Sequence, residues 1–299
     1  GSVNQVFVTG ATPGAPVDLL DGSGAVVASG AADDQGAYVF GNDPGVETPV
    51  PAGGGYRVRE GATTSAAVAV LDPADHPDQS FYDAQALDIA PAGLTQDPEV
   101  GFQYLETRDG TTLSVNVLPP LDPSLSPPYP VVVDYSGYDP SDPDVFSGDP
   151  DHRPMFVARA AGFAVVGVNL RGTTCSGGAY SYWEALQGLD GYDVIETVAA
   201  QPWAERVGMI GLSFPGISQL FVAATQPPHL AAITPQSVIG DTYRSTLYPG
   251  GILNGGFAVD WAAERDGDAR PSAHRWVRER IAAGDTECAA NQVLHRQAV

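Results

Sequence analysis

Ser213 is the residue whose setting in this sequence best suits nucleophilic chemistry. It lies in "GMIGLSFPGISQL" (208–220), where an apolar run typical of a buried strand gives way to a pattern typical of a helix. A strand that passes at once into a helix forces a sharp turn, and Gly211 and Gly216 remove side chains where the two elements crowd together. The hydroxyl would then stand exposed above the sheet. We therefore interpret Ser213 as a candidate nucleophile, with an ordinary turn serine as the alternative.

The backbone after this serine could stabilise negative charge. The next N–H group, that of Phe214, would point at a developing oxyanion, and the N-terminus of the following helix would add partial positive charge. The motif departs from G-x-S-x-G, because Pro215 takes the place of the last glycine and Gly216 comes one residue later. The elements around the motif therefore have to support the interpretation.

Those elements alternate between buried strands and helices. Strands are expected in "PVVVDYSGY", "FAVVGVNLRG", "RVGMIGLS" and "LAAITPQSV", after two strands around the Asp-Gly turn of "TRDGTTLSVNVLP". Helices are expected in "HRPMFVARAAG", "PGISQLFVAATQ" and "YWEALQGLDGYDVIETVAAQP", the last with a glycine interruption. This order predicts a mostly parallel sheet with helices on both faces. "NLRGTTCSGG" (169–178) would form a Gly-rich loop beside the site.

Two flanking regions differ from this α/β pattern. Residues 1–72 hold short alternating runs separated by Gly, Pro, Asp and Asn, which predict a small all-β sandwich of immunoglobulin-like type, packed against the main domain rather than binding a ligand. Residues 73–100 are expected to be a linker. Residues 101–244 would form the α/β core, and 245–299, which are Gly-rich and then helical without a further clear strand, the start of a helical cap.

The composition bounds the partners and the compartment. The chain has 36 acidic and 14 basic residues, and all the basic residues are arginine, so the net charge is −22. Because such a surface repels phosphate groups, nucleic acid and anionic membranes are unsuitable partners. No apolar run reaches the ~18 residues of a membrane span. Cys175 and Cys288 are the only cysteines; they could form one disulfide, and they exclude a cysteine-based zinc cluster. We expect no cofactor. The acidity and the absence of lysine favour a secreted protein.

The segment "YDVIETVAAQPWAERVGMIGLSFPGISQLFVAATQPPHLAAI" (192–233) resembles the cocaine-esterase/NonD branch of the X-prolyl dipeptidyl-peptidase family of α/β-hydrolases almost throughout. "TRDGTTLSVNV" is similar to that family's opening strand pair, and "DYSGYDP" to its strand-3 loop. The resemblance covers roughly residues 100–299. It implies an α/β-hydrolase fold and a serine hydrolase of esters or amides.

The resemblance also implies an oxyanion hole made by the N–H after the nucleophile and a tyrosine hydroxyl from the strand-3 loop. Those positions are Phe214 and Tyr138. A phenol keeps its proton at neutral pH and can reach across a pocket; an ordinary loop tyrosine, and Tyr135 as the donor, are the alternatives. Trp183 and Trp203 could line an acyl pocket, although buried aromatic residues more often belong to the core.

A serine nucleophile needs an imidazole held by a carboxylate, and this base is missing. The candidates for the base are His76, His152, His229, His274 and His295. For each of them we favour an exposed, solvated side chain. The one pair that stays open as acid and base is Asp241 with His274. The resemblance places the acid and histidine after further strands. We therefore expect them beyond residue 299, and a C-terminal fragment of the same protein that completes the fold is one form this could take. We expect residues 1–299 alone to hydrolyse almost nothing.

Four functions stay open. A secreted serine esterase acting through an acyl-enzyme leads, and an X-Pro dipeptidyl-peptidase is the alternative, for which no carboxylates can be assigned to a peptide's free N-terminus. A non-catalytic binding protein on a degenerate hydrolase scaffold is the third. The fourth is a calcium-dependent module, because one loop carries Asp139, Asp142, Asp144, Asp149 and Asp151, although a solvated acidic loop is the simpler interpretation.

Overall fold

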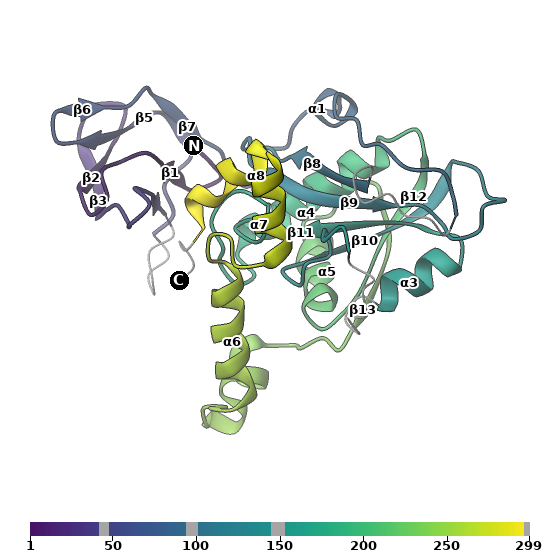
Figure 1. Cartoon of the computed structure of the whole chain (residues 1–299). Helices are drawn as coiled ribbons and strands as arrows, with labels where there is room; N and C mark the ends of the chain where they lie inside the picture. The colour runs from purple at the N-terminus through teal and green to yellow at the C-terminus, as the bar shows by residue number, and fades with distance from the viewer. Residues whose placement is uncertain (42–47, 94–100, 145–152, 296–299) are drawn as a thin grey trace.

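A computed structural model describes residues 1–41, 48–93, 101–144 and 153–295. Two parts follow one another along the chain. The N-terminal part is built of β-strands, and the rest is a central sheet with helices (Figure 1). The C-terminal helices lie between the two parts (Figure 1).

The N-terminal part, here called the β-module, holds the strands that the alternating runs predicted, plus one short additional strand. They are β1 (Val6–Val8), β2 (Pro16–Leu20), β3 (Val26–Ala31), β4 (Tyr38–Phe40), β5 (Gly53–Glu60), β6 (Thr63–Thr64) and β7 (Val68–Val70). A five-stranded sheet has the order β3-β2-β5-β6, with β7 also on β5, and β1 pairs with β4. Leu19 and Phe40 belong to the core between these two sheets. The immunoglobulin-like assignment stays a prediction.

The central sheet has six strands in the order β13-β12-β10-β11-β9-β8. In chain order they are β8 (Phe102–Glu106), β9 (Thr112–Leu118), β10 (Tyr129–Ser136), β11 (Ala164–Asn169), β12 (Ala204–Leu212) and β13 (Leu230–Gln236). β10 to β13 run parallel to one another, whereas β8 pairs with β9, and β9 with β11, in antiparallel register. The sheet is therefore mostly parallel, as the sequence predicted.

Helices cover both faces of this sheet. On β10, Val131 and Val133 pack into a core cluster with α4 (Ala185–Ala199) and α5 (Phe214–Ala224), whereas Val132 packs into a second cluster with α3 (Arg153–Ala160). Successive strand residues point to opposite faces, so a strand buried on both faces is apolar throughout. This explains the uninterrupted apolar run of β10.

Helix α4 is continuous, so the predicted glycine interruption is wrong. Gly188 and Gly191 both lie inside α4. A β-carbon on Gly191 would stand 2.1 Å from the Cγ2 atom of Val222 on α5. Gly191 therefore permits close packing of two helices, and the packing compensates the cost of a glycine within a helix.

The predicted linker packs on the core instead of standing free. Its described part carries α1 (Gln79–Asp83), and the hydroxyl of Tyr82 donates to Asp193 on α4. Leu87 is buried, and its carbonyl accepts a hydrogen bond from the indole N–H of Trp203. Trp203 is thus a core residue and does not line an acyl pocket, in agreement with the alternative given for it from the sequence.

The chain after β13 is helical and forms the cap. Its elements are η2 (Thr242–Leu247), η3 (Pro249–Gly251), α6 (Phe257–Asp268), α7 (Arg275–Ala283), α8 (Thr286–Asn291) and η4 (Gln292–Leu294). A disulfide joins Cys175, in the loop after β11, to Cys288 on α8. The cap is thus covalently attached to the core. Among the described helices, none is long and apolar enough to cross a membrane.

Candidate active site

Ser213 occupies the apex of a sharp turn between β12 and α5. Its φ and ψ angles are 68° and −119°, a combination that a residue with a side chain rarely adopts. Its N–H donates to the carbonyl of Gln236 on β13 at 3.0 Å, and its carbonyl accepts from Ile217 at 2.8 Å. The strand-turn-helix geometry predicted from the sequence is therefore present, with Phe214 as the first residue of α5.

Two glycines make this turn sterically possible. A β-carbon on Gly211, whose φ is 157°, would lie 2.5 Å from the Cβ atom of Pro215. A β-carbon on Gly216 would lie 2.2 Å from the carbonyl oxygen of Gln236. Both positions therefore exclude a larger residue, which explains why the motif keeps its second glycine one place later than usual.

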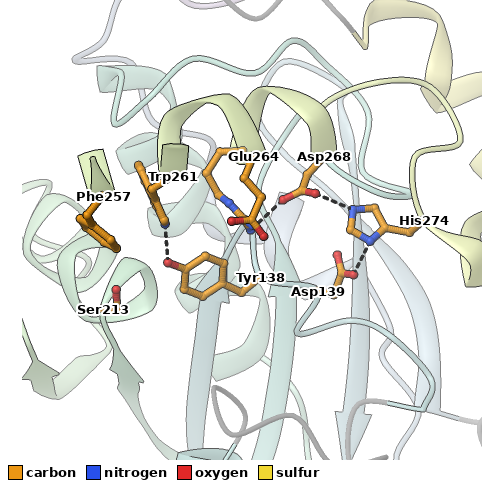
Figure 2. Close-up of a pocket in the computed structure, with 10 residues that line it drawn as sticks. Tyr138, Asp139, Ser213, Phe257, Trp261, Glu264, Asp268 and His274 are labelled. Atoms are coloured by element: carbon orange, nitrogen blue, oxygen red, sulfur yellow. Dashed lines mark hydrogen bonds and ion pairs between the residues drawn. The ribbon is translucent and has the colours of Figure 1, made fainter. Parts of the chain in front are cut away.

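Ser213 lines a pocket of about 430 Å³ together with residues of the β10 loop and the cap (Figure 2). From the loop come Gly137, Tyr138 and Asp139, and from the cap Phe257, Trp261, Glu264, Arg265, Asp268 and His274. Of these residues, Phe257 is the most exposed large apolar side chain, at 66%. The core thus supplies the serine and a phenol, and the cap supplies the facing wall.

Tyr138 is held from three sides. Its hydroxyl accepts a hydrogen bond of 2.8 Å from the indole N–H of Trp261. The Arg265 guanidinium lies 4.9 Å from its ring centre, and the Phe214 ring meets it edge-on at 5.6 Å. Figure 2 shows the hydroxyl at the end of the ring that faces Ser213. Tyr135 offers no such donor, because it is buried and its hydroxyl donates to the carbonyl of Gln187.

Aromatic rings form the wall beside the serine. The Trp183 ring stacks on that of Trp261 with centres 5.8 Å apart, and it meets the Phe214 ring edge-on at 5.3 Å. Trp183 has a φ of 49° and follows Tyr182, whose hydroxyl donates to Asp266 of α6. Trp183 thus lies near the pocket, in contrast to Trp203 in the core.

His274 is tied to two carboxylates and is not the solvated side chain that we expected. Its Nδ1 lies 2.7 Å from Asp139 and its Nε2 3.3 Å from Asp268. Burial alone would lower its pKa, but these interactions raise the pKa to about 10. A histidine that is protonated at neutral pH cannot accept a proton from a serine. Figure 2 also shows it at the end of the pocket away from Ser213.

The remaining described histidines also have other environments. His229 contacts Glu196 at 2.6 Å and His76 stacks on Tyr192, and both are exposed as expected. The expectation is wrong for His295, which is fully buried against the carbonyl of Ser176, where burial lowers its pKa to about 4. His152 lies outside the described residues.

Asp241 does not act with His274 as the predicted pair. It caps η2 by accepting from the backbone N–H of Arg244, and it pairs with the side chain of the same arginine. His274 is held by Asp139 and Asp268 instead. Among the described residues, no hydrogen bond joins Ser213 Oγ to a histidine.

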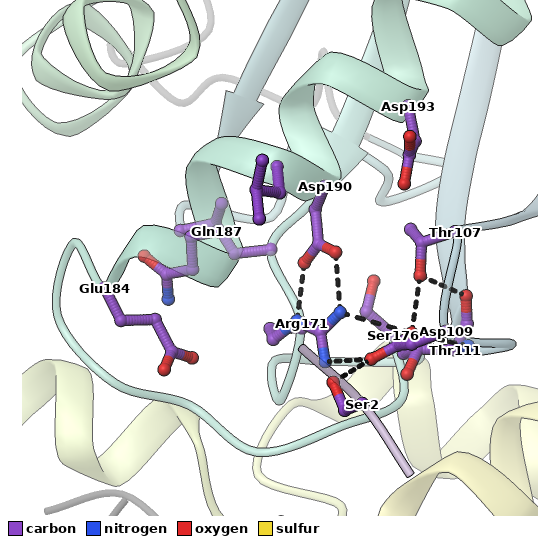
Figure 3. Close-up of polar contacts among 12 residues, drawn as sticks. Ser2, Thr107, Asp109, Thr111, Arg171, Ser176, Glu184, Gln187, Asp190 and Asp193 are labelled. Carbon is purple, nitrogen blue, oxygen red and sulfur yellow. Dashed lines mark hydrogen bonds and ion pairs between the residues drawn. The ribbon is translucent and has the colours of Figure 1, made fainter. Parts of the chain in front are cut away.

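A buried ionic cluster fixes the Gly-rich loop of 169–178 against α4 (Figure 3). Arg171 makes two hydrogen bonds of 2.6 Å to Asp190 of α4 and two of 3.2 and 3.5 Å to Asp109, and all three side chains are buried. The hydroxyl of Ser2, from the start of the β-module, donates to Asp109 as well. The loop is thus a rigid support behind the site, and Thr173 within it packs near Gly137.

The acidic loop after Tyr138 gives little support to a calcium site. Asp139 is paired with His274, and Asp142 accepts from the backbone N–H of Asp144. Burial raises the pKa of Asp142 to about 6. Asp149 and Asp151 lie outside the described residues, and in the described part of the chain no three His, Cys, Asp or Glu residues are arranged so that they could hold a metal ion.

Apart from His274, which was considered as a base, the cap residues of the pocket were not predicted from the sequence. Trp261, Arg265 and Asp268 lie on α6 at spacings of four and three residues, which place them on one helix face. This spacing could have indicated that the three residues share a face of the helix. Which part of the molecule that face meets depends on how the cap folds over the sheet.

The sheet order and the sharp turn at Ser213 define the class of the protein: it has the fold of an α/β hydrolase. A family model of the X-Pro dipeptidyl-peptidase (S15 family) matches residues 109–298. The chain therefore belongs to that family, in its cocaine-esterase/NonD branch.

Two individual proteins are similar to parts of the chain. The chain is 31% identical over 158 residues to the cocaine esterase of Rhodococcus sp. (strain MB1 Bresler), which covers 52% of this chain and 26% of the esterase. A crystal structure of a CocE/NonD family hydrolase from Staphylococcus aureus matches 67% of this chain and 34% of its own, with 24% identity and a TM-score of 0.50. The chain thus spans about a third or less of the length of these relatives.

Proposed function

We propose that this chain supplies the nucleophile and the oxyanion hole of a serine esterase. The conformation of Ser213 carries the proposal, because a strained backbone costs about 1–3 kcal/mol and persists where the surroundings enforce it, typically at functional sites. The enforcing contacts are those of Gly211 and Gly216 with Pro215 and Gln236.

The chemistry follows from the pocket. Ser213 Oγ attacks the carbonyl carbon of an ester while its proton passes to an imidazole, and the alcohol leaves with that proton to give an acyl-enzyme. Water then attacks the acyl-enzyme and releases the acid. The negative oxygen of each tetrahedral intermediate accepts hydrogen bonds from the Tyr138 hydroxyl and the Phe214 N–H, which lies at the unpaired N-terminal end of α5.

We propose that the imidazole and its carboxylate come from a segment outside the 299 residues. Two observations support this. The described histidines are engaged elsewhere, and β13, which pairs only with β12 among the described strands, is largely exposed. Val238, two residues after β13, is an exposed apolar side chain as well. A further strand on this edge would cover apolar surface and pair free backbone groups.

An ester fits the pocket better than an X-Pro peptide with a free N-terminus. The pocket has three carboxylates, but Asp139 and Asp268 are paired with His274, and Asp268 also with Arg265. Glu264 lies 2.9 Å from Arg265 as well. Because these carboxylates already pair with His274 and Arg265, they provide a weak site for an ammonium group.

The disulfide supports secretion, because such bonds persist in oxidising compartments.

A non-catalytic binding protein on the same scaffold is the second candidate function, favoured by the lack of a base within the described residues.

A fluorophosphonate probe and a chromogenic short-chain ester separate these functions. In a longer polypeptide that includes the segment after Val299, we expect labelling and turnover that Ser213→Ala abolishes and Ser245→Ala, at an exposed serine of η2, preserves. A longer polypeptide without labelling would favour the binding protein. Robust turnover by residues 1–299 alone, abolished by Ser213→Ala, would contradict an external base.

A further inference from the structure

We propose that Trp261 on the cap is the positioning residue for the oxyanion donor Tyr138, so that the cap helix α6 completes the oxyanion hole. The inference rests on the proposed function, in which Tyr138 is an oxyanion donor, and it adds a role for Trp261, the residue that contacts the Tyr138 hydroxyl. The central observation is the 2.8 Å hydrogen bond from the Trp261 indole to the Tyr138 hydroxyl, across 123 residues of sequence.

The direction of this hydrogen bond decides its effect. The indole N–H can only donate, so the phenol oxygen must accept. The indole then occupies one lone-pair direction of the oxygen, and the proton of the hydroxyl has to point elsewhere. Accepting a hydrogen bond also polarises the O–H group and makes it a stronger donor. Tyr138 is thereby left to donate into the pocket that it shares with Ser213.

The same face of α6 holds the segment that carries Tyr138. Arg265, four residues after Trp261, lies over the Tyr138 ring, and Asp268, three residues further, reaches His274. His274 in turn pairs with Asp139, the neighbour of Tyr138, whose φ of 57° is unusual for an aspartate. The loop and the helix are therefore linked at the hydroxyl, at the ring and at the next residue.

Trp261 is distinguished from the other tryptophans by this bond. Trp203 donates to a backbone carbonyl of the core, and the indole N–H groups of Trp183 and Trp276 have no hydrogen-bond partner among the described residues. Trp276 lies on α7 against Phe102, outside the pocket of Ser213. Trp276→Phe is therefore a matched control for Trp261→Phe, which removes an N–H but keeps an aromatic ring.

The first experiment detects the bond in residues 1–299 by NMR of the indole N–H groups. Tyr138→Phe should shift the Trp261 signal upfield and speed its exchange with solvent, while the Trp203 signal stays in place. Trp261→Phe identifies the signal by its loss. A Trp261 signal that does not respond to Tyr138→Phe would overturn the inference.

The second experiment is a double-mutant cycle on the hydrolysis of the chromogenic ester by the active, longer polypeptide. We expect Tyr138→Phe to lower kcat by roughly 100-fold, as for loss of one oxyanion-hole donor. Trp261→Phe should lower kcat roughly 3- to 10-fold with little change in KM, the effect of one neutral hydrogen bond. In the Tyr138→Phe background, Trp261→Phe should not lower kcat further. Trp276→Phe should leave kcat unchanged both in the wild type and in the Tyr138→Phe background.

The outcomes separate the two proposals. Equal losses from Trp261→Phe in both backgrounds, or a loss confined to KM, would mean that Trp261 acts by packing or by contact with the substrate, and would overturn the positioning role alone. Activity unchanged by Tyr138→Phe would instead contradict the oxyanion hole of the proposed function, whatever the NMR result.

Discussion

Gly216 lies against the same carbonyl oxygen of Gln236 that accepts the N–H of Ser213. A β-carbon on Gly216 would be 2.2 Å from that oxygen, and the hydrogen bond from Ser213 is 3.0 Å long. The glycine therefore permits the close approach of α5 to β13 that the turn at Ser213 requires. Pro215, in the place where a glycine was expected, packs instead on Gly211.

Gly216→Ala should displace α5 from β13. We expect a loss of about 1–3 kcal/mol in the free energy of unfolding, as for overpacking, because the contact is with backbone and cannot yield as a side chain would. Urea titration followed by circular dichroism measures it. Gly267→Ala is the control: a β-carbon there meets nothing within 4 Å, and replacing a glycine within α6 should stabilise by about 0.5–1 kcal/mol. Equal stability of Gly216→Ala and the wild type would refute the steric account.

Arg171→Met should be strongly destabilising. The change leaves Asp109 and Asp190 buried without their counter-charge, for which about 3–5 kcal/mol is typical. The same substitution at Arg59, which pairs with Asp18 on the surface of the β-module, should cost about 0–1 kcal/mol. Similar losses from the two variants in urea titrations would argue against a structural role for the buried cluster.

His274→Gln should change how stability depends on pH. The interactions with Asp139 and Asp268 raise the pKa of His274 from 6.5 to about 10 against the effect of burial. Because the folded protein binds this proton more tightly, the stabilisation is complete below pH 6.5 and is lost as the pH rises through 10. The wild type should therefore exceed the variant in stability most at pH 6, and the difference should shrink towards pH 10.

Denaturant titrations at pH 6, 8 and 10 test this dependence. The charge of His274 lowers the pKa of Asp142, which is about 6, so the change in stability between pH 8 and pH 10 is the part that reports on His274 alone. A difference that is constant with pH would show that His274 contributes by packing and not by its charge.

Removal of the disulfide should loosen the cap more than the sheet. Replacing Cys175 and Cys288 by serine frees a loop of 113 residues, and about 2–4 kcal/mol of stability is expected to be lost. Hydrogen exchange should speed up first in α7 and α8, which the bond holds to the core. Faster exchange confined to β10 and β12 would contradict this assignment.

The strands and helices of the core could be predicted because each is apolar with a clear period. β11 is buried on both faces and β10 nearly so, β12 alternates between buried and half-buried residues after Arg206, and the turn at Ser213 has glycines where backbone approaches backbone. The glycine interruption in α4 was predicted wrongly, because the sequence does not show that Gly191 faces Val222 across two helices.

The facing wall of the pocket could not be predicted because it depends on tertiary packing. Trp261 and Tyr138 meet only because the cap returns over the β10 loop, and His274 is charged only because Asp139 and Asp268 lie on both sides of it. His295 gave no clear signal either: in the sequence it stands between the apolar Leu294 and the charged Arg296, but in the fold it is buried against a carbonyl of the 169–178 loop.

The disulfide encloses Ser213, since one cysteine precedes it in the chain and the other follows it. Protease cleavage in the largely exposed stretch between β13 and α6 would therefore leave both pieces in one covalent molecule. Such nicked protein would migrate as an intact chain on a denaturing gel and separate into two bands only after a reductant is added. Purity judged without reductant would overlook that damage.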